Sequence, residues 1–219
     1  MLNDDTRKKL EDIIGGIVLE GQEDYCTATR NFLCQRFSTS TTVKRNFEGL
    51  SAIKEEQVVL LKKYATQTSG WVSHVPDEGL FLAKGGESQV YLHEDNRHVI
   101  KLNDGNYYAT WLEFFNSILI HNLLFQDTAY TFLGFVEKDN KLMAVLKQSF
   151  ITADSTVDLS DIKAFLTYNG FKNTRNNDYY SNELGLILED LHDENVIFQS
   201  NKLFFIDTVI YIDLERKKG

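Results

Sequence analysis

The first third of the chain carries apolar residues at the spacing of amphipathic helices. In residues 3–20 the apolar positions follow the i, i+3, i+4, i+7 pattern that gathers side chains on one helix face. Residues 23–37 repeat this pattern, and residues 50–65 predict a third helix. We therefore expect a small helical subdomain at residues 1–69, and packing against the neighbouring domain is a simpler role for it than a separate activity.

The pattern then changes to short β-rich runs separated by polar turns, which is typical of antiparallel strands. These runs occupy residues 80–102 and 130–146. Between them, residues 106–125 have a broad apolar face and predict the longest helix of the chain. Further on we expect a short helix ending at Tyr168 and a polar surface loop at residues 172–178.

A polar loop near the C-terminus lies between apolar runs and holds the most specific chemical signal. Asp190 and Asn195 have the spacing D-x-x-x-x-N, and the apolar run after the loop ends at Asp207. In phosphoryl-transfer sites a carboxylate of this spacing faces the substrate hydroxyl, while the amide and a strand-borne Asp hold magnesium. Asp and Asn are also common in turns, where they hydrogen-bond the local backbone. Both a phosphotransfer site and the ordinary turns of an α+β binding domain fit these residues.

A glycine-containing turn joins the first two predicted strands in the stretch A-K-G-G-E-S-Q-V-Y. Gly85 and Gly86 would let the backbone come close to phosphate groups. Against the G-x-G-x-x-G-x-V frame of kinase glycine loops, Gly85 takes the second glycine position, Ser88 takes the third, and Val90 matches. A simple hairpin turn explains the two glycines equally well.

Three further polar residues are candidates because of their apolar surroundings. Lys101 lies in the run H-V-I-K-L, where a lysine either extends its side chain to solvent or has an anionic partner, which in a kinase-like lobe is the phosphates of ATP. Glu113 is the sole acidic residue between Gly105 and Asp127, so it either pairs with Lys101 or faces solvent. We expect residues 147–150 to leave the sheet as a hinge, whose backbone meets an adenine edge and whose Gln148 binds the nucleotide.

Length, composition and charge narrow the function classes. The chain has 219 residues, enough for one large or two small domains, with 42% hydrophobic and 25% charged residues, as in ordinary globular proteins. The net charge of −9 argues against nucleic acid as a main partner, because phosphate backbones are bound chiefly through clustered Lys and Arg. No apolar run has the roughly 18 residues of a membrane span, and the N-terminus lacks a signal-peptide segment, so we expect a cytoplasmic protein without a membrane partner.

The two cysteines agree with this compartment. Cys26 and Cys34 are placed on one predicted helix, roughly 12 Å apart along its axis, which is too far for a disulfide. Unpaired cysteines are typical of a reducing environment.

The order of these features is that of a protein-kinase fold: glycine turn, strand Lys, helix Glu, two strands, hinge, helix, D-x-x-x-x-N and strand Asp. The sequence resembles the small kinase-like domain of bacterial mobile-element "polyvalent" proteins, a minimal relative of protein kinases and aminoglycoside phosphotransferases. The resemblance covers the chain from about residue 55 or 70 to its end. The segments that carry it are G-G-E-S-Q-V-Y (85–91), V-I-K (99–101), D-L-H-D-E-N-V-I (190–197) and F-F-I-D (204–207).

The resemblance implies an α+β, protein-kinase-like fold. An antiparallel N-terminal β lobe with one long helix would occupy residues 70–147, and a truncated C-terminal lobe residues 148–219, preceded by the helical subdomain at residues 1–69. It also implies ATP and Mg²⁺ as cofactors. Departures from the family pattern occur next to the key aspartates, where Leu188 and Glu189 precede Asp190 and Thr208 and Val209 follow Asp207.

The resemblance further implies a role for each candidate. Lys101 would hold the α and β phosphates and assist catalysis, Glu113 would orient Lys101, and Asp190 would be the catalytic base. Asn195 and Asp207 would hold magnesium, and the glycine turn would contribute nucleotide-binding backbone.

The implied function is an ATP- and Mg²⁺-dependent phosphotransferase whose acceptor is a protein Ser, Thr or Tyr hydroxyl, or else a small hydroxyl compound. Because 12 residues follow Asp207, we expect neither an activation segment nor a helical substrate lobe. A protein substrate or partner would then complete the platform for the acceptor. The alternative is a catalytically silent, kinase-like module that binds a nucleotide or another protein.

Overall fold

Three helices precede the first sheet. The computed structural model describes residues 3–21, 24–38, 50–74 and 76–213, so residues 214–219 of the predicted second lobe lie outside the described part. The helices are α1 (Asp4–Ile14), α2 (Tyr25–Cys34) and α3 (Ser51–Gln67). The helix predicted to continue to residue 20 ends at Ile14, because Gly15 and Gly16 follow and Gly16 adopts φ +68°, outside the helical region. Cys26 and Cys34 both lie on α2 as free thiols.

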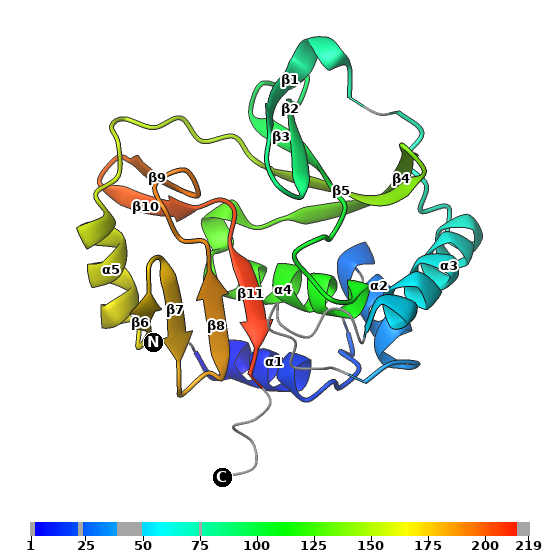
Figure 1. The fold of residues 1–219 in the computed structure, drawn as a ribbon, viewed down its shortest axis with the longest axis horizontal. Coiled ribbons are helices and arrows are strands. Elements are labelled where there is room, and N and C mark those ends of the chain that lie inside the picture. Colours follow the sequence, from blue (N-terminus) through cyan, green and yellow to red (C-terminus); the bar gives the residue numbers. More distant parts are fainter. Residues whose placement is uncertain (1–2, 22–23, 39–49, 75, 214–219) are drawn as a thin grey trace.

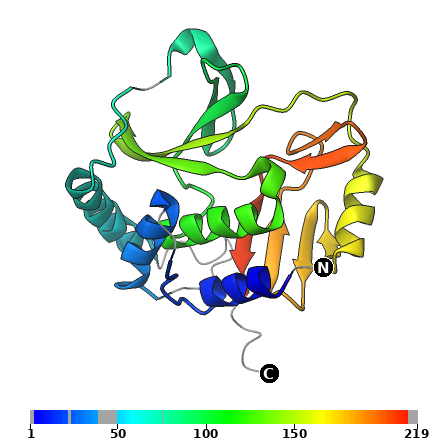
Figure 2. The same cartoon turned by 180° about the vertical axis from the view of Figure 1, so that it is seen from behind.

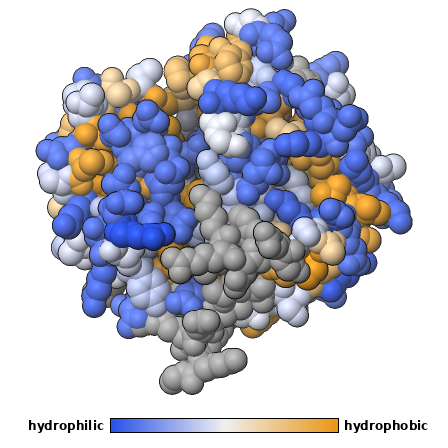
Figure 3. Space-filling model, in the orientation of Figure 1, coloured by the Kyte–Doolittle hydropathy of each residue, from blue (hydrophilic) through white to orange (hydrophobic). Residues whose placement is uncertain are grey.

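A five-stranded antiparallel sheet follows, with strand order β1-β2-β3-β5-β4 (Figure 1). Its strands are β1 (Phe81–Lys84), β2 (Ser88–Leu92), β3 (His98–Asn103), β4 (Thr131–Lys138) and β5 (Lys141–Ser149), preceded by the short helix η2 (Glu78–Leu80). β1 is exposed along its whole length. A hydrophobic patch at the top of Figure 3 lies where Figure 1 places the β1–β2 hairpin, and exposed Phe81 and Leu82 belong to this hairpin.

The expectation that residues 147–150 leave the sheet is wrong. β5 stays paired with β3 up to Ser149, whose partner is His98. At this end of the strand, half-buried and buried positions alternate over residues 147–149, with Gln148 on the buried side. The segment that crosses to the rest of the chain therefore begins at Phe150.

Helix α4 (Trp111–Leu124) lies between the five-stranded sheet and α1, as both ribbon views show (Figures 1 and 2). It is buried from Trp111 through His121, which is expected for a helix that is apolar on all sides. Its aromatic side chains pack edge to face with those of β4, for example Phe115 with Phe132 at 5.1 Å between ring centroids. The short helix η3 (Gln126–Thr128) connects α4 to β4.

The rest of the chain forms one helix, a four-stranded antiparallel sheet and a hairpin. The sheet has strand order β11-β8-β7-β6, and β9 pairs with β10. The elements are α5 (Leu159–Tyr168), β6 (Lys172–Arg175), β7 (Asp178–Ser181), β8 (Leu186–Glu189), β9 (Val196–Gln199), β10 (Lys202–Phe205) and β11 (Val209–Ile212). The surface loop predicted at residues 172–178 is instead the β6–β7 hairpin. β6 is polar and exposed at every position, so it has no hydrophobic alternation that would reveal a strand.

The helices, the four-stranded sheet and one face of the five-stranded sheet share the main apolar core, while the other face of the five-stranded sheet carries a second, smaller cluster. Buried side chains of α1, α2, α3 and α4 join those of β4, β5, α5, β8 and β11 in a single cluster. The architecture confirms the predicted α+β class with antiparallel sheets. Among the helices of the described ranges, none combines the length and apolar character that crossing a bilayer requires.

Candidate functional site

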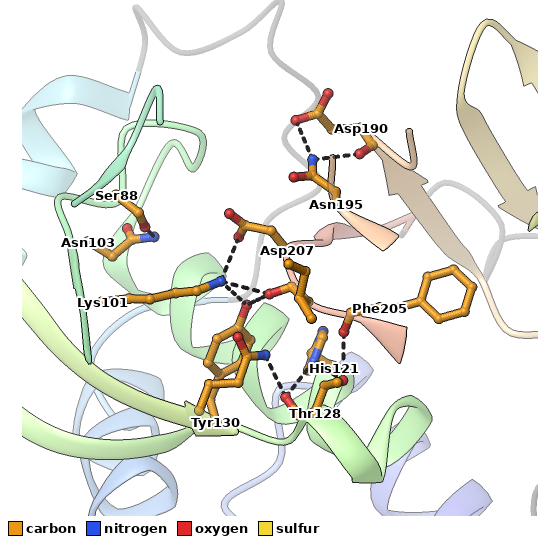
Figure 4. A network of polar contacts seen from close by, with 12 residues as sticks. Ser88, Lys101, Asn103, His121, Thr128, Tyr130, Asp190, Asn195, Phe205 and Asp207 are labelled. Carbon is orange, nitrogen blue, oxygen red and sulfur yellow. Dashed lines mark hydrogen bonds and ion pairs between the residues drawn. The ribbon is translucent and has the colours of Figure 1, made fainter. Parts of the chain in front are cut away.

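The centre of the candidate site is a contact between a buried lysine and a half-exposed aspartate. The Lys101 side chain is 6% exposed and the Asp207 side chain 40%, and Lys101 Nζ lies 3.7 Å from Asp207 Oδ1. The same ammonium group donates a hydrogen bond to the Ile206 carbonyl oxygen at 2.7 Å (Figure 4). The chain therefore satisfies the expected need of Lys101 for an anionic partner, and the partner reaches solvent.

The local folds explain why these residues meet. β3 lies in the middle of the sheet, where Lys101 is paired with Val90 of β2 and Leu146 of β5. Asp207 follows the β9–β10 hairpin. The end of this hairpin lies against the segment that joins α4 to β4. The backbone there is anchored by two side chains, since Thr128 Oγ1 donates to the Phe205 carbonyl at 2.6 Å and Tyr130 Oη donates to the Ile206 carbonyl at 2.7 Å (Figure 4).

Gln148 supports this anchor and does not face a ligand. Its side chain is buried, with 2% of the residue exposed, and Nε2 donates to the Thr128 carbonyl at 2.6 Å. The prediction that Gln148 contacts the nucleotide is corrected accordingly, because a buried amide already engaged with the backbone is not available to a ligand. Gln148 thus fixes Thr128 through its carbonyl, and the Thr128 hydroxyl fixes the backbone at Phe205, two residues before Asp207.

The predicted pairing of Glu113 with Lys101 stays a prediction, and the hydrogen bonds described for Glu113 lie at the start of α4. Glu113 lies in the first turn of α4, where its carboxylate accepts a hydrogen bond from the Ala109 N–H at 3.1 Å and its own N–H donates to Thr110 Oγ1 at 3.2 Å. This is capping chemistry at a helix N-terminus. Lys101 forms an ion pair with the carboxylate of Asp207.

The glycine turn closes the β1–β2 hairpin above β3. Gly85 N–H donates to the Ser88 carbonyl at 2.8 Å, and both glycines are exposed. The Ser88 hydroxyl is buried and accepts a hydrogen bond from Asn103 Nδ2 at 2.9 Å, so it fixes the turn on β3. Gly86 has a steric reason to be glycine, because an added Cβ would lie 1.9 Å from the Tyr107 hydroxyl oxygen.

A carboxylate that the sequence reasoning missed lies in this turn. Glu87 is 9% exposed, and its carboxylate accepts a hydrogen bond from the Tyr107 N–H at 3.3 Å. Burial raises the pKa of Glu87 to about 7, although hydrogen bonding to Asn103 lowers it, and the negative charge of Asp207 raises it further. An acidic residue beside two glycines was the only available sequence signal, and it does not reveal burial.

We expect Glu87 to make the free energy of unfolding depend on pH. Its pKa of about 7 in the folded protein is above the ordinary value of 4.5, so the folded state holds the proton more tightly. The stabilisation is complete below about pH 4.5 and is lost as the pH rises through 7, by up to about 3 kcal/mol. The measurement is denaturant unfolding of the wild type and Glu87→Gln between pH 4.5 and 8, in EDTA without nucleotide.

Since Glu87→Gln cannot titrate, the wild type should lose stability relative to this variant across that range. The matched control is Glu94→Gln on the exposed β2–β3 turn, whose difference from the wild type should stay small throughout. A wild-type to Glu87→Gln difference that does not change with pH would contradict the assignment.

The loop between β8 and β9 brings Asp190 and Asn195 together. Asn195 Nδ2 donates to the Asp190 carbonyl at 2.8 Å and to Asp190 Oδ2 at 3.1 Å (Figure 4). Asp190 adopts φ +66°, a left-handed conformation that Asp and Asn tolerate better than most residues. His192 Nε2 lies 3.2 Å from Asp190 Oδ1, so the histidine braces the loop. The Asp190 side chain remains 49% exposed.

The loop is tied to the lysine–aspartate contact through the backbone. Ile206 N–H donates to the Asn195 carbonyl at 3.0 Å, directly before Asp207. The structure therefore brings Lys101, Asp190, Asn195 and Asp207 to one region, with the glycine turn above them. The sequence showed no sign of the supporting roles of Thr128 and Tyr130. Their hydrogen bonds join residues that are 77 and 76 positions apart in the chain.

The oxygen donors of this region suit magnesium. Mg²⁺ is usually bound by one or two carboxylates together with substrate phosphates and water. Asp207 offers a half-exposed carboxylate, and Asn195 offers an amide oxygen on the neighbouring hairpin end. Within residues 3–213 as far as they are described, no three His, Cys, Asp or Glu side chains form a metal cluster. A metal site here would therefore need further ligands from a bound nucleotide.

A comparison of the sequence with known protein families gives a match that includes these residues. The sequence profile of the family described as "Serine/Threonine/Tyrosine Kinase found in polyvalent proteins" matches residues 54–214. The match begins within α3 and includes Lys101, Asp190, Asn195 and Asp207. No curated protein matches the chain significantly.

Proposed function

The chain belongs to the family of Ser/Thr/Tyr kinases found in polyvalent proteins, and from this premise we propose that it is an ATP- and Mg²⁺-dependent phosphotransferase. The observation that carries the proposal is the 3.7 Å contact between Lys101 Nζ and Asp207 Oδ1 beside the Asp190–Asn195 loop. Two elements that are 106 residues apart in sequence supply a cation for phosphates and an anion for a metal at one place. The acceptor is the hydroxyl of a protein Ser, Thr or Tyr residue.

Each residue has a role that follows from its surroundings. Lys101, buried on a central strand, would bind the α and β phosphates and fix the nucleotide. Gly85 and Gly86 would present exposed backbone to the phosphates, with Val90 nearby on β2. Asp190, half-exposed and oriented by Asn195 and His192, would accept the acceptor hydroxyl proton.

Asn195 and Asp207 would hold Mg²⁺, which when bound neutralises charge on the transferring phosphates. Thr128 and Tyr130 keep the Asp207 carboxylate beside Lys101 by holding the two preceding carbonyls. The protein thus contributes chiefly position and charge, as phosphoryl transfer requires.

We also propose that the kinase unit begins with α3, not at residue 70 as the sequence pattern predicted. Gln57 Oε1 accepts the N–H groups of Trp111 and Leu112 at 2.7 and 3.2 Å, which caps the N-terminus of α4. Lys54 Nζ donates to the Gly105 and Tyr108 carbonyls at 2.7 and 2.8 Å. The five-stranded sheet with α4 would form the N-terminal lobe, and the elements after Phe150 a small C-terminal lobe.

Thermal unfolding with ATP and Mg²⁺ tests the proposal. At 100 times the dissociation constant the wild type should gain roughly 2.7 kcal/mol of stability. Asp207→Ala should lose most of this gain, because the site keeps the lysine but loses a metal ligand. Glu194→Ala, which removes an exposed carboxylate from the adjacent loop, is the matched control and should respond like the wild type. Equal nucleotide shifts for Asp207→Ala and the wild type would reject the site.

One observation favours a second candidate function, a nucleotide-binding module without turnover. The Asp190 carboxylate is already engaged by Asn195 and His192. A nucleotide-dependent shift without phosphate transfer to any protein would select this module.

A further inference from the structure

Tyr107 lies at the point where the glycine turn meets the acidic residues of the site. It belongs to the loop between β3 and α4, and its ring ends against Gly86, where an added Cβ would be 1.9 Å from the hydroxyl oxygen. Its backbone is fixed on both sides. The N–H donates to the Glu87 carboxylate at 3.3 Å, and the carbonyl accepts the Tyr211 hydroxyl at 2.6 Å. The phenol is therefore held against the exposed glycine turn.

The surroundings of this hydroxyl are those of the proposed phosphotransfer groups. The pKa of Tyr107 is raised, first by partial burial and then by nearby negative charges, of which that of Asp104 acts less strongly than those of Glu87, Asp190 and Asp207. These three carboxylates come from the glycine turn, the β8–β9 loop and the end of the β9–β10 hairpin. The hydroxyl thus lies against the proposed phosphate-binding turn, within the electrostatic influence of the proposed base.

We propose that Tyr107 is the acceptor of an intramolecular phosphoryl transfer, an inference that rests on the proposed function. A nucleotide held by Lys101 below the glycine turn would place its phosphates beside Gly86, which the Tyr107 hydroxyl contacts. An acceptor fixed to the same chain needs no separate platform, and fixing two reactants together removes much of the entropic barrier.

The step balances without a further reagent. The Tyr107 oxygen forms a bond to the γ-phosphorus of ATP, while the bond from that phosphorus to the β–γ bridging oxygen breaks and ADP leaves. The phenol proton passes to the Asp190 carboxylate. The product phosphate carries a charge of about −1.5 to −2 beside Glu87 and Asp207. Repulsion should therefore move the modified side chain away from Gly86 and uncover the turn.

The test is mass spectrometry of the purified chain after incubation with ATP and Mg²⁺. We expect one phosphate per molecule on Tyr107, at a fractional rate that does not depend on protein concentration. Tyr107→Phe should lose at least ten-fold in incorporation. Tyr168→Phe is the matched control, because Tyr168 is 90% exposed on α5, and it should behave like the wild type. Site mapping on the unmutated chain keeps the test independent of whether Tyr107→Phe folds.

The outcomes separate this inference from the proposed function. Phosphate on another residue with Tyr107 unmodified, or a fractional rate that rises with protein concentration, overturns the intramolecular acceptor but leaves the phosphotransferase intact. A nucleotide-induced thermal shift with no phosphate incorporated into the chain also overturns the acceptor, and assays with added protein substrates then distinguish transfer to a separate protein from the silent module. Absence of both shift and phosphate removes the proposed function as well.

Discussion

Asp190→Asn should lower the rate of phosphate transfer by about 10²- to 10⁴-fold, the usual contribution of a positioned general base. The substitution removes the proton acceptor and changes little else. Asn tolerates the φ of +66° at this position, and an amide oxygen can still accept the hydrogen bond from Asn195. The measurement is the initial rate of phosphate incorporation, together with the ATP and Mg²⁺ thermal shift.

We expect that thermal shift to persist in Asp190→Asn, because neither Lys101 nor Asp207 is altered. Asp193→Asn is the matched control, with a carboxylate 64% exposed in the same loop, and it should keep the wild-type rate. Equal rate losses in both variants would mean that loop charge matters and that Asp190 has no special role. An unchanged rate in Asp190→Asn would remove it as the base.

Gly134→Ala should lower the free energy of unfolding by about 3 kcal/mol or more. Gly134 adopts φ +137° at an irregularity in β4, and an added Cβ would lie 2.3 Å from the Gly70 carbonyl oxygen. That atom is backbone, and the Gly70 carbonyl also accepts the Phe135 N–H at 2.8 Å. Relief of the clash therefore requires separating β4 from the segment after α3. Denaturant unfolding measures the loss.

Gly170→Ala separates the clash from simple backbone strain. Gly170 ends α5 with φ +83°, but no atom lies within 4 Å of its added Cβ. Its substitution should cost only about 1–2 kcal/mol, the usual penalty for a side chain in left-handed backbone. If the two variants lose the same stability, the close approach of Gly134 to Gly70 does not contribute as described.

The sequence predicted the elements that stand out as long or well-bounded apolar segments. α4 was found because it is apolar along its length, and β3, β9 and β10 were found as apolar runs between turns. Exposed β6 and the short buried strand β11 were not predicted. The first has no alternation, and the second has four apolar residues, too few to establish a period.

The sequence singled out Lys101 and Asp207, which the structure places in contact, but it missed the carboxylate Glu87 and the neutral supports. Lys101 stood out because a cation in an apolar strand needs a partner, and Asp207 because an apolar run ends there. For Glu113 the sequence shows a carboxylate in a helix but not whether it caps the helix or reaches a strand, and the structure shows a capping hydrogen bond. Thr128 and Tyr107 gave no signal, because their significance arises from contacts made only in the folded chain.

Affinity labelling of the nucleotide-binding lysine tests the central claim most directly. An acyl-phosphate derivative of ATP transfers its acyl group to the amine that lies beside the bound phosphates, and peptide mass spectrometry identifies the modified residue. We predict that Lys101 is labelled, that excess ATP with Mg²⁺ protects it, and that Asp207→Ala reduces the protection. Labelling that ATP blocks at another lysine, for example Lys84 or Lys54, with Lys101 unmodified, would contradict the account.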